Sequence, residues 1–204
     1  MSAPKTTRGQ HSRDHIVATA AEIMRTHGVE GTSIDVVLAA AGASKSQLYH
    51  YFSSRQGLIR SVIAYQAVNV VQAQSERLRT VDSWPSLQRW FDEIVEIQQA
   101  YEWRLGCPVG SLAAELADHN DEARGDLAAA LNQWRDDIEA MLRRLQSNGA
   151  LRRGAHCRSL AVATLAAIQG ALLLSKLNRD PEPLRATLAT IYSTLHGHRP
   201  QRSS

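Results

Sequence analysis

The stretch "GASKSQLYHYFSSRQGL", residues 42–58, decides how the chain is interpreted. Ser44 is a typical helix N-cap, and Leu48 and Phe52 lie four residues apart, so they can anchor one face of a short helix to a core. The remaining side chains are left on exposed or flanking faces: Lys45, Ser46, Gln47, Tyr49 and His50. A surface helix that projects two aromatic rings, a lysine and an amide is costly unless something binds there.

The residues just before this helix predict a second short helix. In "TSIDVVLAAAG", residues 32–42, Thr32 or Ser33 can cap the helix and Gly42 can end it. Ile34, Val37 and Leu38 fall on one face, while three alanines let another helix approach closely. A helix, a short glycine-containing turn and a second helix with polar side chains are typical of a helix-turn-helix DNA reader.

Helical periodicity continues through the rest of the chain, and no alternating strand pattern interrupts it. Ile16, Ala20, Ile23 and Met24 mark the core face of a first helix that ends before Gly28. Further helices are expected at about 54–80, 84–103, 111–118, 121–148, 156–178 and 181–196. We therefore predict an all-α fold of about nine helices.

Composition and charge narrow the class of protein. With 204 residues, of which 44% are hydrophobic, the chain can bury a substantial core. Residues 1–60 hold seven basic and four acidic side chains, so the whole net charge of +3 lies there and suits a polyanionic partner. Cys107 and Cys157 suggest two partly buried free thiols rather than a disulfide framework. The longest apolar stretch, from Leu160, falls short of a membrane span, so we expect a cytoplasmic protein without membrane contact.

One family shares the residues of this helix-turn-helix. The order formed by Ala39–Gly42, Ser44, Leu48, Tyr49, Phe52, Arg55 and Leu58 resembles the DNA-binding domain of TetR-family transcriptional regulators. The resemblance covers about residues 12–60. It implies a flexible basic arm at 1–11, a DNA-binding domain at 12–58, and a ligand-binding and dimerisation domain at 59–204.

The resemblance and the helix geometry together suggest roles on double-stranded DNA. Lys45, Ser46 and Gln47, at the start of the recognition helix, are expected to contact base edges. The expected phosphate contacts are Thr32, Ser33, Tyr49, His50 and Arg55. Other roles stay open, because Gln47 can also close a capping box on Ser44 and Tyr49 can simply pack.

Two histidines and the basic arm allow further alternatives near the N-terminus. His11 and His15 are spaced for a shared metal, but no third ligand is evident, and a solvated basic arm is the expected role. The segment "TTRGQHSR" can also lie along the minor groove of DNA. We expect neither a metal nor a cofactor.

A two-fold operator needs a homodimer, and in TetR regulators the last two helices of each subunit form the interface. The residues expected there are Leu165, Ile168, Leu172, Leu184, Leu188, Ile191 and Leu195. The helix from about 156 is apolar nearly all round, which offers one face to its own core and one to a partner. The alternative is that both helices are only intramolecular core.

The middle helices are expected to hold a small, largely apolar or aromatic effector, because aromatic residues concentrate there. The expected contacts are Trp90, Phe91, Ile94, Gln98, Trp103, Cys107, Leu112, Glu115 and Trp134. "GCPVGSLAAEL", residues 106–116, is also reminiscent of the LmrA-like branch of the family, whose members respond to drugs and flavonoid-like aromatics.

These observations predict a repressor that a ligand releases from a palindromic operator. An activator of the same fold would read DNA in the same way. A small helical enzyme using Cys107 is the other alternative, but no catalytic triad, metal cluster or phosphate loop accompanies that thiol, so we expect no enzyme.

Overall fold

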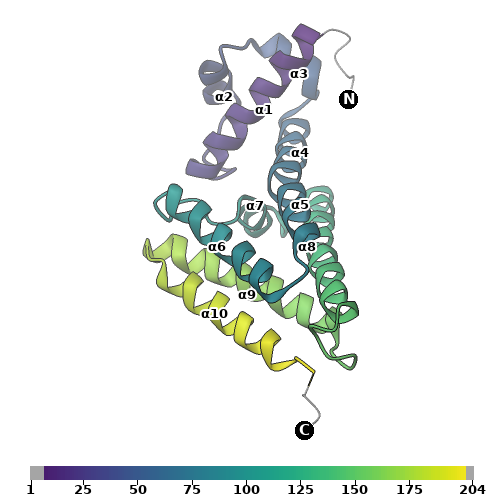
Figure 1. The fold of residues 1–204 in the computed structure, drawn as a ribbon. Coiled ribbons are helices and arrows are strands. Elements are labelled where there is room, and N and C mark those ends of the chain that lie inside the picture. Colours follow the sequence, from purple (N-terminus) through teal and green to yellow (C-terminus); the bar gives the residue numbers. More distant parts are fainter. Residues whose placement is uncertain (1–6, 201–204) are drawn as a thin grey trace. The chain divides into compact units, whose positions relative to one another are not determined.

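The computed structural model describes residues 7–200 and is all-α, with 79% of its residues in helices and no strand in that range (Figure 1). The helices are α1 (Thr7–His27), α2 (Ile34–Ala41), α3 (Lys45–Phe52), α4 (Arg55–Gln66), η1 (Ala67–Gln72), α5 (Ala73–Thr80), α6 (Trp84–Ala100), α7 (Pro108–Leu116), α8 (Asp121–Ser147), α9 (Cys157–Asn178) and α10 (Glu182–Gly197). The π-helical segment η1 joins α4 and α5 into one helical stretch. The described chain therefore has the predicted nine helices when this stretch is counted once.

Several helix boundaries differ from the sequence prediction, and α7 begins at Pro108 rather than near Ser111. Residues 7–11, expected in a flexible arm, are helical and belong to α1, while residues 1–6 of that arm lie outside the described part. Helix α6 ends at Ala100 rather than near Trp103, because Glu102 and Trp103 both have positive φ angles, of 51° and 60°. That backbone conformation is incompatible with a right-handed helix.

The chain divides into two compact units, each with its own core. Its N-terminal unit comprises the described residues 7–70 and 108–130, so α7 and the start of α8 pack with α1–α4. The sequence-based boundary at 58/59 did not anticipate this grouping. Its core includes Ile16, Met24, Val37, Leu38, Leu48, Phe52, Leu58, Val62, Val109, Leu112 and Leu127.

The second unit comprises the described residues 71–107 and 131–200. Helices α9 and α10 pack along each other, and α6 lies against α10 (Figure 1). The core includes Leu78, Leu87, Trp90, Phe91, Ile94, Trp134, Ile138, Met141, Ile168, Leu172, Leu184 and Leu188.

Helix α9 is the one described helix that is long and apolar enough to cross a membrane by length and composition. Only 33% of its most apolar window is buried within the subunit, although core helices of globular proteins pass the same test. The exposed apolar surface of α9 therefore needs a separate explanation.

Candidate nucleic-acid interface

Local capping signals place α2 and α3 at the expected positions in the N-terminal unit. The Ser33 side chain accepts a hydrogen bond from the Val36 N–H, and Gly42 ends α2 in the left-handed conformation, with φ 59°. Glycine is favoured there because it has no Cβ. Ser44 then caps α3 after a very short turn, as a helix-turn-helix requires.

Helix α3 separates its anchoring residues from its outward-facing ones. Leu48 and Phe52 are buried as predicted, and Tyr51 is buried beside them. Tyr49 is 53% exposed, and four other candidate DNA contacts on α3 are also exposed: Lys45, Ser46, Gln47 and His50. These five side chains are therefore exposed to solvent on a helix whose opposite face is buried in the core.

Gln47 forms the capping box that the sequence left as an alternative. Its Oε1 accepts from the Ser44 N–H at 2.9 Å, and its own N–H donates to Ser44 Oγ at 3.2 Å. Both bonds satisfy groups that a helix start would otherwise leave unpaired. A base contact by Gln47 must therefore use its amide NH2 or displace the first of these bonds.

Lys45 pairs with an acidic side chain that sequence reasoning missed. Its Nζ lies 3.0 Å from Oδ1 of Asp35, in the first turn of α2, and both side chains are exposed. The hydrogen bond to Asp35 raises the pKa of Lys45 because it favours the charged ammonium group. The two residues are ten apart in sequence, so only the turn between α2 and α3 brings them together.

Thr32 does not lie where a phosphate contact requires. It is only 2% exposed, and its hydroxyl donates to the carbonyl oxygen of Gly28 at 2.6 Å. The end of α1 leaves carbonyl groups without helical partners, and the Thr32 hydroxyl satisfies one of them. Ser33, which is exposed, remains the candidate at the start of α2.

Replacing Thr32 with valine separates a structural role from a DNA-binding one. Thr32→Val keeps the shape but leaves the Gly28 carbonyl without this donor, so the free energy of unfolding should fall by about 1 kcal/mol. DNA affinity, measured well below the unfolding transition, should stay unchanged. Chemical denaturation and a DNA titration check both; a loss of affinity without a loss of stability would restore the phosphate contact.

Arg55 is also engaged within the protein. Its Nη2 donates to the Val29 carbonyl at 2.7 Å and to the Thr32 carbonyl at 3.4 Å, which ties the start of α4 to the turn before α2. The side chain is only 33% exposed. A phosphate contact would have to use its remaining donors, so the structure assigns Arg55 first to positioning α2.

The residues predicted to bind an effector are divided between the two units. Leu112 and Glu115 belong to the N-terminal unit, where Glu115 Oε2 accepts from the Val29 N–H at 2.6 Å. The others belong to the second unit, and most are buried: Trp90, Phe91, Ile94, Gln98, Cys107 and Trp134, with Trp103 partly exposed. Spacing along the chain does not reveal that the short helix α7 packs with α1–α4.

Within the second unit, the polar groups among these residues differ in their partners. Trp90 Nε1 donates to Gln74 Oε1 at 2.8 Å, and Gln98 exchanges two hydrogen bonds with the backbone of Gly106. The buried Trp134 Nε1 has no acceptor among the described residues. A buried donor without an acceptor is unusual in proteins and is compatible with a ligand that supplies one.

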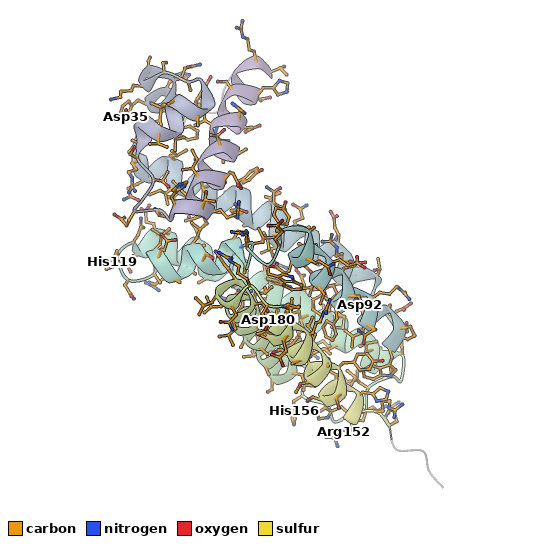
Figure 2. The ribbon with its side chains drawn as sticks, turned by 90° about the vertical axis from the view of Figure 1, so that its left-hand side faces the viewer. Asp35, Asp92, His119, Arg152, His156 and Asp180 are labelled. Atoms are coloured by element: carbon orange, nitrogen blue, oxygen red, sulfur yellow. The ribbon has the colours of Figure 1, made fainter. Side chains whose placement is uncertain are left out.

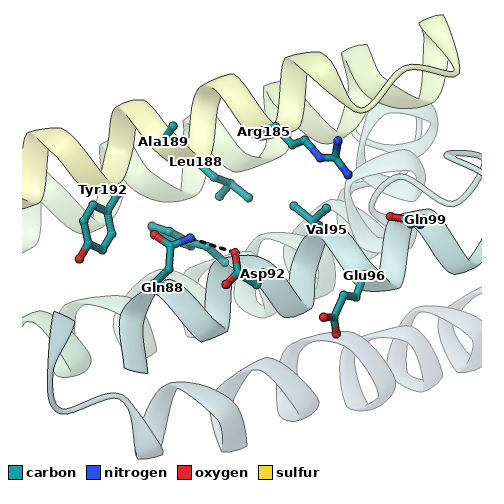
Figure 3. A pocket seen from close by; sticks show the side chains of 10 residues that line it. Gln88, Asp92, Val95, Glu96, Gln99, Arg185, Leu188, Ala189 and Tyr192 are labelled. Carbon is teal, nitrogen blue, oxygen red and sulfur yellow. Dashed lines mark hydrogen bonds between the residues drawn. The ribbon is translucent and has the colours of Figure 1, made fainter. Parts of the chain in front are cut away.

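A groove between α6 and α10 is open on the second unit (Figure 3). Its volume is about 520 Å³, within the range of small-molecule sites. Among its lining residues, Phe91 is the one that the sequence predicted as an effector contact. The other lining residues are Gln88, Asp92, Val95, Glu96, Gln99, Arg185, Leu188, Ala189 and Tyr192. Sequence reasoning followed the aromatic residues of the middle helices, whereas the groove combines apolar, polar and charged side chains from two segments that are distant in sequence.

The predicted dimer contacts are mostly used within the subunit. Ile168, Leu172, Leu184, Leu188, Ile191 and Leu195 are buried, and Leu165 is partly exposed. Helix α9 instead exposes a row that we call the α9 outer face: Val162, Ala166, Gly170, Leu173 and Leu177. These residues recur every three or four positions, as one helix face requires, and Leu177 is 73% exposed.

Comparison with known proteins identifies the family. Residues 16–62 match the family model for bacterial regulatory proteins of the tetR family, and residues 84–190 match the C-terminal domain of LmrA/YxaF-like transcriptional regulators. The chain is 26% identical over 185 residues to the HTH-type transcriptional repressor DhaR of Mycobacterium sp. (strain GP1), covering 90% of this chain and 91% of that one.

Another relative and a solved structure agree with these matches. An HTH-type transcriptional regulator of Mycobacterium tuberculosis (strain H37Rv) is 28% identical over 200 residues, covering 95% of this chain and 99% of the relative. The crystal structure of a TetR regulatory protein from Rhodobacter sphaeroides superposes with a TM-score of 0.81 at 23% identity, covering 91% and 98% of the two chains. The exposed start of α3, the capped helix-turn-helix and both family matches agree: the chain belongs to the TetR family of DNA-binding transcriptional regulators, with a C-terminal domain of the LmrA/YxaF-like type.

Proposed function

We propose that the protein is a dimeric, cytoplasmic repressor that binds a palindromic operator and is released by a small, largely apolar ligand. The observation that carries this proposal is the start of α3, where Lys45, Ser46 and Gln47 are exposed on a helix whose opposite face is buried. Side chains at this end of a recognition helix reach base edges in the major groove. The relative DhaR, named a transcriptional repressor, favours repression over activation.

Contacts to the DNA backbone would come from exposed groups around this helix. Ser33 caps α2, where a helix N-terminus favours anions, and Tyr49 and His50 are exposed on α3. Contacts to phosphate groups do not distinguish one base from another. These residues should therefore determine the affinity for DNA and the register of the protein on it, rather than the sequence preference.

The first test is selection of bound duplexes from a random DNA pool by the purified protein, followed by a salt titration. We expect an enriched palindrome whose half-sites lie about one helical turn apart, and an affinity that falls steeply with salt. Binding without any enriched sequence, or binding insensitive to salt, would contradict the proposal.

Substitutions at the start of α3 test which residues read sequence. Lys45→Ala and Gln47→Ala should change the enriched sequence, with about 1–3 kcal/mol lost for each good base contact. Tyr49→Phe should weaken binding to specific and scrambled duplexes alike. The measurement is repeated selection with each variant.

A matched control is needed because Gln47 also caps α3. Gln47→Glu keeps an acceptor for the Ser44 N–H, removes the amide donor and adds a negative charge, which should lower affinity for every duplex. If Gln47→Glu retained the original sequence preference while Gln47→Ala lost it, the capping box, and not base contact, would explain the effect of Gln47.

We place the dimer interface on the α9 outer face together with the exposed side of α10. That side of α10 carries mostly small residues: Ala186, Thr190, Ser193 and Gly197. Small side chains let helices of two subunits approach closely, and the exposed leucines of α9 would supply apolar area.

We place the effector in the second unit. The groove between α6 and α10 has suitable volume and is lined by both apolar and charged side chains (Figure 3), and the buried Trp134 N–H offers a donor elsewhere in the same unit. These features favour an apolar molecule that carries at least one polar group. A ligand with this character, added to the protein bound to its selected duplex, should release the DNA.

A further inference from the structure

The charges on the helix-turn-helix cancel each other. Between Gly31 and Ser54 the chain has one acidic residue, Asp35, and one lysine, Lys45, and no arginine. The two are paired at 3.0 Å. The α2–α3 segment therefore offers DNA no lysine or arginine that is not already matched by a carboxylate.

The position of Asp35 places its carboxylate on the surface that meets DNA. Asp35 lies in the first turn of α2, and its oxygen reaches the side chain of the first residue of α3. Figure 2 shows Asp35 at the outer edge of its unit, and its side chain is 72% exposed. A carboxylate beside a helix N-terminus occupies the kind of position that a DNA phosphate would otherwise take.

We propose that Asp35 is a specificity-determining positioning residue. Its carboxylate forms with Lys45 the ion pair that a DNA phosphate would otherwise form. This proposal rests on the proposed function, in which α3 enters a DNA groove. On non-specific DNA, Lys45 stays with Asp35, and the carboxylate repels nearby phosphates. On the operator, base acceptors replace Asp35 as the partner of Lys45, so the pair opens only where the sequence offers a better one.

The low energy of an exposed ion pair suits this role. Such pairs stabilise a fold very little, because water solvates both groups well. The pair can therefore open at little cost when base acceptors are present. Its effect should appear in the ratio of specific to non-specific binding and not in stability.

The charged groups near Lys45 and Asp35 do not provide Lys45 with another acidic partner. Arg55 is turned toward the carbonyl groups of Val29 and Thr32, and Glu30 faces Arg55 at 4.0 Å rather than Lys45. Lys45 therefore has Asp35 as its acidic partner within the described unit, and Asp35→Asn should release it.

The test measures binding of full-length variants to a scrambled duplex and to the selected operator across a salt series. Asp35→Asn should bind the scrambled duplex about five- to tenfold more tightly at 0.1 M salt, with a salt slope steeper by about 0.9, as expected for one additional phosphate contact. Operator affinity should change less, so specificity falls. Asp35→Glu keeps a carboxylate near Lys45 and should behave like the unmodified protein.

Lys45→Gln, alone and combined with Asp35→Asn, decides whether Asp35 acts through Lys45. The gain on scrambled DNA should disappear in the double variant. A gain that persists without Lys45 would show general charge repulsion, and no gain in Asp35→Asn would show that the pair does not restrain Lys45; either result overturns the inference. If the unmodified protein showed no salt-dependent binding, the proposed function itself would fail, which is a distinct outcome.

Discussion

Ala166→Arg is expected to convert the protein to a monomer and to abolish tight operator binding. Ala166 lies near the middle of the α9 outer face, between Val162 and Gly170, and is exposed in the single subunit. In the proposed dimer, the substitution would bury an unpaired guanidinium group on each copy, which costs about 3–5 kcal/mol when no partner compensates it. Since about 1.4 kcal/mol corresponds to a factor of ten, operator affinity should fall about a hundredfold or more.

Ala140→Arg is the matched control for this substitution. Ala140 is also an exposed alanine within a long helix, α8, but it lies outside the α9 outer face. Light scattering coupled to size exclusion should show a dimer for Ala140→Arg and a monomer for Ala166→Arg, while circular dichroism should show that both are folded. A dimeric Ala166→Arg protein with normal operator affinity would place the interface elsewhere.

Gly57→Ala is expected to destabilise the N-terminal unit strongly for a change of one methyl group. A Cβ at position 57 would lie 1.9 Å from the carbonyl oxygen of Phe52, which belongs to the backbone at the end of α3. Because a backbone atom cannot move aside cheaply, the junction between α3 and α4 must shift. The expected loss is about 1–3 kcal/mol of unfolding free energy. Operator affinity should fall as well, since this junction positions the recognition helix.

Gly125→Ala adds the same methyl group as Gly57→Ala but is expected to raise the stability of the protein rather than lower it. Gly125 lies in α8, in the same unit, and a Cβ there would meet no atom within 4 Å. Alanine is favoured over glycine inside helices by up to about 1 kcal/mol, so this variant should be slightly more stable. Calorimetry measures both, with a shift in Tm of about 2–4 °C for each kcal/mol. Equal stability of the two variants would mean that Phe52 does not approach Gly57 as closely as the structure shows.

Features encoded over a few neighbouring residues could be predicted from the sequence. Ser44 and Gly42 mark a helix start and a helix end through their own backbone preferences, so the α2–α3 turn was located correctly. The spacing of Leu48 and Phe52 likewise identified the buried face of α3. The all-α class follows from the same local periodicity repeated along the chain.

Roles that depend on a distant partner could not be predicted. Thr32 and Arg55 are polar residues at plausible phosphate positions, yet both satisfy carbonyl groups around the end of α1, which only folding brings to them. Glu115 accepts a hydrogen bond from the Val29 N–H, which lies 86 residues away in sequence and is brought to it only by folding. The sequence shows which polar groups these residues carry, but not which groups they contact.

Helix α9 shows most clearly which features can be predicted from the sequence and which depend on tertiary packing. Its composition determined that it is an apolar helix with more than one apolar face, but such a helix has no single stripe to distinguish core from exterior. Packing against α10 decided that Ile168 and Leu172 lie inside and that Leu173 and Leu177 remain exposed. By itself, the sequence determined the helices, their caps and the DNA-binding family, because these depend on local preference and pattern. The tertiary structure decided which polar groups are free to meet DNA and which apolar face is left for a partner, because both depend on what each helix packs against.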